Sequence, residues 1–323
     1  MVITSLEVLC VVLVLAVVFQ DYLAGIFSDV PRLEDAATVF VAVCAQALPF
    51  LVLGVVISGA IAAFIPAGVL RKALPKRAAL AVPVAGVAGV ALPGCECASV
   101  PVSRRLIQQG VAPSAAFAFL LAAPAVNPIV LVSTAVAFPG NPEMVLARFL
   151  GSLATAVVMG WLWAKWGKLD WIAERALRRL PDNPGGSRWT TFVETARHDL
   201  VDSGGFLVIG GVTAAALNVY VSTAWLDTLS GQLLLGILVM AVLAVILAIC
   251  SEADAFVAAS LSMLPLLPRL VFLVVGPVVD VKLIALQAGT FGKSFAFRFA
   301  PVTFLVAVAC AVGAGLLVFG GVR

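Results

Sequence analysis

Long apolar runs separated by short polar segments dominate this chain. A helix needs roughly 20 apolar residues to cross the hydrocarbon core of a bilayer, and runs of that length recur along the sequence. Two further apolar runs, 79–93 and 230–250, end in breaks that carry cysteines, and the first is short for a full crossing. The pattern predicts membrane-spanning helices over 5–27, 36–64, 112–138, 143–167, 202–222, 268–290 and 298–320.

Composition supports a membrane protein and excludes several other classes. The chain has 323 residues, of which 63% are hydrophobic and 11% charged, and its mean hydropathy is +1.14. Soluble domains carry about 25% charged residues. There is no basic domain of the kind that binds nucleic acid. The N-terminal run lacks a basic segment and a small-residue cleavage site, so 5–27 is expected to be a retained span. We expect an all-α polytopic protein whose main partner is the lipid bilayer.

The distribution of Lys and Arg predicts an unusual topology. Both 66–78 and 103–111 are basic, so the positive-inside rule places them in the cytoplasm. Only one apolar run lies between them, and 79–111 is therefore predicted to be a re-entrant hairpin. The region 230–268 is predicted to do the same from the outside, which leaves Arg269 on the outer side.

The order of segments predicts an internal inverted repeat. Phe119–Pro128 resembles Phe272–Val281 at an offset that also places Cys97 over Cys250 and Asn127 over Asp280. Each half reads as three spans and a re-entrant broken-helix hairpin, and the halves start from opposite sides. Transporters of this type bind substrate near the midplane, between broken helices. The predicted divisions are an extra N-terminal helix (1–35), repeat half 1 (36–168), a cytoplasmic interfacial linker (169–201) and repeat half 2 (202–323). The linker is expected to contain a short helix at 170–180.

The stretch Leu92–Pro101 carries the most specific chemical signal. Its sequence is Leu-Pro-Gly-Cys-Glu-Cys-Ala-Ser-Val-Pro, with Cys95 and Cys97 flanking Glu96. The prolines disfavour helix here, so the two cysteines are predicted on non-helical backbone at membrane depth. Thiolates bind soft species such as Cu(I), Zn(II) and trivalent arsenic or antimony, and Cys250 could supply a third sulfur. The alternative is a polar loop at the membrane surface with incidental cysteines.

Charged residues interrupt the second half at related positions. Glu252 and Asp254 follow Cys250, while Asp280 and Lys282 lie inside the predicted span 268–290. Because an unpaired charge costs about 3 kcal/mol or more at this depth, Lys282 is expected to pair with Asp280 or Glu252. These groups would couple protons or balance charge, or Asp280 and Lys282 would form a purely structural pair.

The remaining polar and small residues have simpler expected roles. Asn127, between Pro124 and Pro128, would line the substrate path through the membrane. The alternative is a proline kink whose freed backbone groups bond to neighbouring groups. His198 is expected to be solvated. Cys10, Cys44 and Cys310 are expected to be buried small hydrophobes. Close helix packing is expected at Gly54, Gly59, Gly204, Gly205, Gly210 and Gly211.

These motifs resemble those of the YraQ/ArsP-type permease family. The resemblance rests on Gly94–Cys97, on Pro101–Arg104, on Phe119–Pro128 and on the blocks Cys250–Phe256 and Gly276–Lys282. It implies an inner-membrane permease, and members similar to ArsP export trivalent organoarsenicals while relatives are linked to copper or zinc efflux. The family pattern has a small residue between the two cysteines, where this chain has Glu96. An acidic residue there favours a cation over a neutral arsenical.

The sequence therefore predicts a secondary transporter, not an enzyme, that exports a thiophilic metal or metalloid across a bacterial plasma membrane. Its N-terminus is expected in the cytoplasm, and neither a resident cofactor nor a catalytic residue is expected. Three alternative functions stay open: a membrane thiol-disulfide oxidoreductase using Cys95 and Cys97, a structural subunit of a metal-handling system, and a transporter of another small solute. A homodimer also stays open. Substrate binding is assigned to Cys95, Glu96, Cys97, Cys250 and Asn127, and the three cysteines would be ligands of the transported species. Proton coupling or charge balance is assigned to Glu252, Asp254, Asp280 and Lys282.

Overall fold

All regular elements in the described part of the chain are helices. The computed structural model describes residues 31–65, 74–75, 77–92, 95–177, 187–220 and 233–320. The predicted first span, 5–27, lies outside the described residues. Five helices are long and apolar enough to cross a membrane, which confirms the polytopic all-α class. They cover Asp35–Phe64, Pro113–Ala137, Pro142–Trp166, Arg188–Leu217 and Lys293–Val318.

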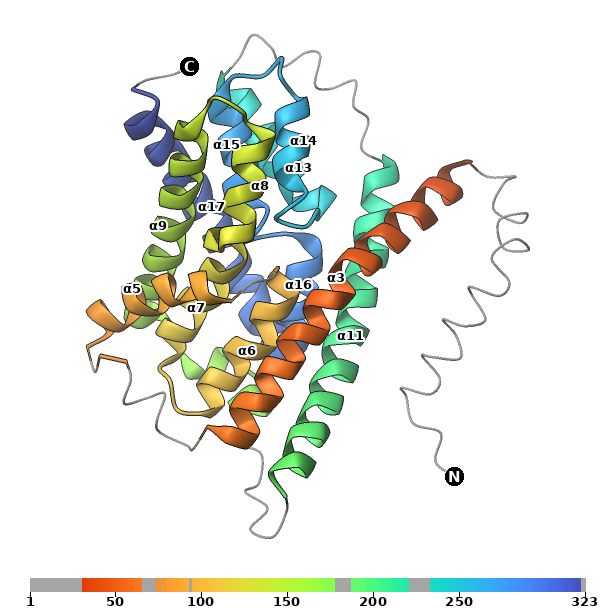
Figure 1. The fold of residues 1–323 in the computed structure, drawn as a ribbon, viewed down its shortest axis with the longest axis vertical. Helices are drawn as coiled ribbons and strands as arrows, with labels where there is room; N and C mark the ends of the chain where they lie inside the picture. Colours follow the sequence, from red (N-terminus) through yellow and green to blue (C-terminus); the bar gives the residue numbers. More distant parts are fainter. Residues whose placement is uncertain are drawn as a thin grey trace.

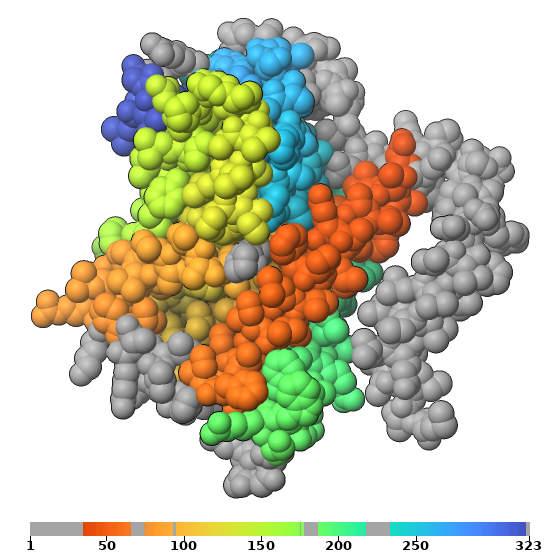
Figure 2. All heavy atoms as spheres, viewed as in Figure 1, coloured from red at the N-terminus to blue at the C-terminus, as the bar shows by residue number. Residues whose placement is uncertain are grey.

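Two long helices form one side of the molecule. α3 (Pro31–Phe64) and α11 (Arg188–Tyr220) pack along each other, and α3 runs diagonally across the face seen in Figures 1 and 2. α11 begins at Arg188, not at residue 202 as predicted, so the last part of the predicted linker belongs to this helix. His198 lies on it, with its side chain 56% exposed as expected.

Short helices flank the two cysteine-bearing breaks. The first hairpin consists of α5 (Ala78–Ala88), the 3-10 turn η1 (Gly89–Ala91) and α6 (Glu96–Gln108). The second consists of α13 (Leu233–Leu247) and α14 (Asp254–Ser260). The longest of these helices has 15 residues, which is about 23 Å and less than the roughly 30 Å of a bilayer core. Within the described residues, neither hairpin has a helix of crossing length, and their re-entrant course stays a prediction.

Each hairpin is followed by a broken span and a long helix. In the first half these are α7 (Pro113–Val126), α8 (Pro128–Ala137) and α9 (Pro142–Trp166). In the second half they are α15 (Leu266–Val275), α16 (Val281–Phe291) and α17 (Lys293–Val318). α9 packs on α17, and α7 on α9. The same order of elements thus occurs twice, and the inverted relation between the halves stays a prediction.

One end of the bundle, called the basic end below, carries Lys165, Lys293 and Arg298 at the adjoining ends of α9 and α17. At this end the Ala173 N–H donates to the Phe291 carbonyl over 2.7 Å, and the Arg298 guanidinium lies 4.9 Å from the Trp171 ring. The short elements here are η2 (Leu169–Trp171) and α10 (Glu174–Leu177), so the helix predicted over 170–180 is shorter where it is described. At the other end the Arg269 guanidinium lies 5.5 Å from the Phe138 ring, a contact that accommodates a cation on the predicted outer side.

Candidate functional site

The Cys-Glu-Cys motif forms the start of a helix. Cys95 is the N-cap of α6, and Glu96 and Cys97 lie in its first turn. The prediction that these residues lie on non-helical backbone is therefore wrong after Cys95, and α6 continues through Pro101. A helix tolerates this proline at the cost of one hydrogen bond, since it has no N–H to give to the Cys97 carbonyl. Pro93 and Gly94 lie outside the described residues.

Cys250, the cysteine of the second hairpin, lies in an irregular turn between α13 and α14. The N–H groups of Ala253 and Asp254 donate to the Cys250 carbonyl over 2.9 and 3.0 Å. Ala248, two residues earlier, has a φ of 49°, a left-handed conformation that costs an alanine about 1–2 kcal/mol. Its carbonyl lies 3.4 Å from the Lys282 Nζ. The strained turn thus presents both a sulfur and a carbonyl to Lys282.

Three thiols from the two hairpins meet in the interior. The ligand atoms of Cys95, Glu96 and Cys97 lie within 4.8 Å of one another, and the Cys95 thiol interacts with those of Cys97 and Cys250. Cys95 and Cys97 are 0% exposed and Cys250 is 2% exposed. All three are free thiols. The compact group consists of Cys95, Glu96 and Cys97, and Cys250 adjoins it at the Cys95 thiol. The described residues therefore offer two soft ligands with a third beside them, all closed to solvent.

A buried ion pair joins the halves beside these thiols. The Lys282 Nζ lies 2.5 Å from Glu96 Oε1 and 4.0 Å from the Cys250 Sγ. Neither Lys282 nor Glu96 is more than 1% exposed. Lys282 therefore pairs with the carboxylate between the two cysteines of the other half, not with Asp280 or Glu252 as predicted.

Asn127 and Asp280 have matching local roles. The Asn127 side chain caps α8 by accepting from the Val130 N–H over 3.0 Å, and Asp280 caps α16 by accepting from the Leu283 N–H over 2.5 Å. Both are buried at the breaks of their spans. Asp280 Oδ2 has no hydrogen-bond partner among the described residues. These two residues therefore cap the helices that resume after the two breaks.

A second buried ion pair involves Arg148, which the sequence analysis missed. Its Nη2 donates to both Asp254 carboxylate oxygens over 2.9 and 3.0 Å and to the Ser251 carbonyl over 2.9 Å. Its Nη1 donates to the Thr134 hydroxyl over 2.7 Å. The signal was present, because Arg148 interrupts the predicted span 143–167 and an ionisable residue within a span marks a functional position. Glu252, beside this group, is half-buried.

A third polar group, also missed, joins α3, α6 and α11. The Ser58 hydroxyl donates to Asp199 Oδ2 over 2.6 Å. The Arg105 Nη2 lies 3.4 Å from the same oxygen. Asp199 is 3% exposed and Arg105 4% exposed. This group lies between the long helices and the C-terminal part of α6, toward the basic end of the bundle.

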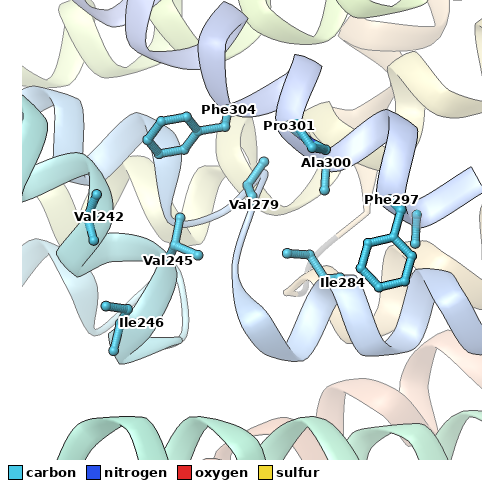
Figure 3. Close-up of a pocket in the computed structure, with 10 residues that line it drawn as sticks. Val242, Val245, Ile246, Val279, Ile284, Phe297, Ala300, Pro301 and Phe304 are labelled. Carbon is cyan, nitrogen blue, oxygen red and sulfur yellow. The ribbon is translucent and has the colours of Figure 1, made fainter. Parts of the chain in front are cut away.

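One described groove is lined entirely by apolar residues. It has a volume of about 290 Å³, and its walls come from α13, the α15–α16 break and α17. Figure 3 shows the side chains facing a common space. Val279 and Ile284, on either side of the capping Asp280, belong to its wall. None of the thiols lines this groove.

Buried charges and thiols between broken helices, within a bundle of apolar spans, define a polytopic transport protein. The chain belongs to the predicted permease family ArsP_1, whose sequence profile matches residues 32–316. It is 35% identical to the Bacillus subtilis UPF0718 protein YcgR over 284 residues, 85% of this chain and 94% of that protein. It is 30% identical over 296 residues to a Streptococcus mutans protein named as a candidate subunit of a two-component membrane permease complex, covering 88% of this chain and 96% of that protein. No solved structure matches the chain. The resemblance to this permease family is confirmed, and the protein is a membrane permease.

Proposed function

We propose that this permease exports a thiophilic metal or metalloid species through the centre formed by Cys95, Cys97 and Cys250. The observation that carries the proposal is the approach of three free, buried thiols from two hairpins far apart in the sequence. Sulfur ligands favour Cu(I), Zn(II) and trivalent arsenic or antimony over Mg²⁺ and Ca²⁺. These species would be transported cargo and not resident metals.

The surrounding polar residues would balance the charge of the cargo. Lys282 and Glu96 form a neutral pair beside the sulfurs, and Asp254 is neutralised by Arg148. Glu252 Oε1 and Asp280 Oδ2 are among the buried carboxylate oxygens that have no hydrogen-bond partner within the described ranges, and they would receive a coupling cation. Asn127 would position the α7–α8 break next to the cargo.

The orientation and assembly are part of the same proposal. Arg105 and Arg298 belong to the basic end, which we place in the cytoplasm of a bacterium by the positive-inside rule, together with the N-terminus. The chain would act in the plasma membrane as a homodimer or with a second subunit. The name of the Streptococcus mutans relative favours the second form.

A transport assay in everted vesicles tests the cargo. Accumulation would be measured for arsenite, methylarsenite, antimonite, Cu(I) and Zn(II), with wild type and Cys97→Ser. We expect one of these species to accumulate and Cys97→Ser to lower its uptake at least about tenfold, since even second-shell changes cost 10–100-fold at metal sites. Cys310→Ser on α17, half-buried and outside the centre, is the matched control and should transport normally.

Two results would contradict this proposal. Uptake that survives Cys97→Ser would remove sulfur from the mechanism. Failure to accumulate any of the five species would reopen the substrate class. A thiol-disulfide oxidoreductase, the alternative from the sequence, would change the cellular thiol redox state without changing the metal content of the cell.

A further inference from the structure

Arg148 holds the Cys250 turn to the opposite half of the molecule. It lies on α9 and is 0% exposed, and its guanidinium reaches Asp254 and the Ser251 carbonyl on the second hairpin. The Thr134 hydroxyl on α8 accepts from the same guanidinium. One side chain therefore ties α8, α9 and the start of α14 together, directly beside a cysteine of the thiol centre.

The Arg148–Asp254 contact lies near one end of the bundle. Arg148 follows Pro142, the first residue of α9, by six residues, which is about 9 Å along the helix axis. Pro142 and the Phe138–Arg269 contact lie at the end opposite the basic residues. The Arg148–Asp254 pair thus lies between the thiols and the predicted outer face.

The Ser58–Arg105–Asp199 group lies on the other side of the thiols, toward the basic end of the bundle. It joins α6, which carries Cys95 and Cys97 at its start, to both long helices. Arg105 lies in the last turn of α6, toward the basic end. A closed thiol centre therefore has one buried ionic group toward each face.

We propose that the Arg148–Asp254–Ser251 contact is the outer gate of the permease and that the Ser58–Arg105–Asp199 group is the inner gate. Alternating access requires that a central site open to one side at a time, and each group fastens the hairpin that would have to move. Removing one partner of a buried ion pair favours states in which the remaining charge reaches water. The inference rests on the permease function but not on the identity of the cargo.

Sided thiol labelling tests the gates without any cargo. A membrane-impermeant maleimide would be added to right-side-out or everted vesicles that contain the full chain, and mass spectrometry would locate the labelled cysteines. In wild type, Cys95, Cys97 and Cys250 should react slowly from both sides, because they are buried. In Arg148→Met, we expect Cys250 to be labelled at least about tenfold faster from the outside only, which needs a shift of about 1.4 kcal/mol in the opening equilibrium.

Arg105→Met is the matched control with the opposite expected direction. It should increase labelling of Cys97 from the inside only. Faster labelling of Cys250 from both sides in Arg148→Met would indicate general loosening and overturn the gate. If Cys250 of Arg148→Met is labelled from the outside at the wild-type rate, the outer gate is overturned as well.

A second variant covers the case in which Arg148→Met does not assemble. Arg148→Lys keeps the charge but cannot reach Asp254, Ser251 and Thr134 together, since an ammonium lacks the planar fork of a guanidinium. We expect a smaller rise in labelling, again from the outside only, and wild-type labelling of this variant would contradict the proposal.

Discussion

Lys282→Met is expected to destabilise the permease by about 3–5 kcal/mol and to abolish transport. The substitution leaves the Glu96 carboxylate buried without the ammonium that lies 2.5 Å away, and removing one partner of a buried ion pair has a cost of this size. Methionine fills a similar volume, so the loss comes from the charge and not from a cavity. Thermal unfolding in detergent and vesicle transport measure the two effects.

The double variant Glu96→Gln/Lys282→Met separates folding from transport. It removes both charges, so we expect it to regain most of the lost stability. Transport should stay absent if the pair balances the charge of the cargo next to Cys95 and Cys97. A double variant that transports normally would show that the pair is only structural.

A lysine on the surface gives the reference value. Lys293, the first residue of α17, is exposed, and Lys293→Met should change stability by no more than about 0.5 kcal/mol. If Lys282→Met behaves like Lys293→Met, the buried ion pair has no energetic importance, and its proposed role in transport would have to be withdrawn.

Local sequence patterns predicted the helices and breaks because those patterns act over a few residues. The apolar runs gave the spans corresponding to α3, α9 and α17 within a few residues at most ends. Asn127 and Asp280 aligned at one offset, and both are N-caps. Proline was the weak guide, because Pro101 lies inside α6 while the break precedes Cys95.

Long-range pairing could not be read from the same patterns. Lys282 was expected to pair with Asp280 or Glu252 of its own half, but its partner is Glu96 in the other half. The choice depends on how α6 and α16 pack, which neither composition nor spacing specifies. Cys44 and Cys310 show the same limit, since both are half-buried where full burial was expected.

Glycines on the long helices show what packing adds to sequence. Gly54 on α3 lies against the Ala98 backbone, next to Cys97, and a Cβ on it would overlap the Ala98 Cα. A Cβ on Gly210 of α11 would lie 2.8 Å from the Lys282 Cα. Gly204 and Gly205 have nothing within 4 Å of an added Cβ among the described residues, so their predicted packing role is wrong.

Gly54→Ala and Gly210→Ala are therefore expected to impair transport at least about tenfold and to destabilise the protein by about 1–3 kcal/mol, the usual cost of overpacking. The added methyl group meets backbone in both cases, and backbone cannot rotate away as a side chain can. Gly54→Ala should displace the start of α6 and its cysteines, and Gly210→Ala should displace Lys282 from Glu96. Vesicle transport and thermal unfolding would be measured for each.

Gly205→Ala provides the opposite expectation on the same helix as Gly210. Its methyl group enters open space, and alanine favours a helix over glycine by about 0.8–1 kcal/mol, so this variant should be as stable as wild type or slightly more stable and should transport normally. Equal losses at Gly205 and Gly210 would mean that any added volume on α11 disturbs the permease. A loss at Gly210 alone would show that the long helices set the position of the charged centre through direct backbone contact.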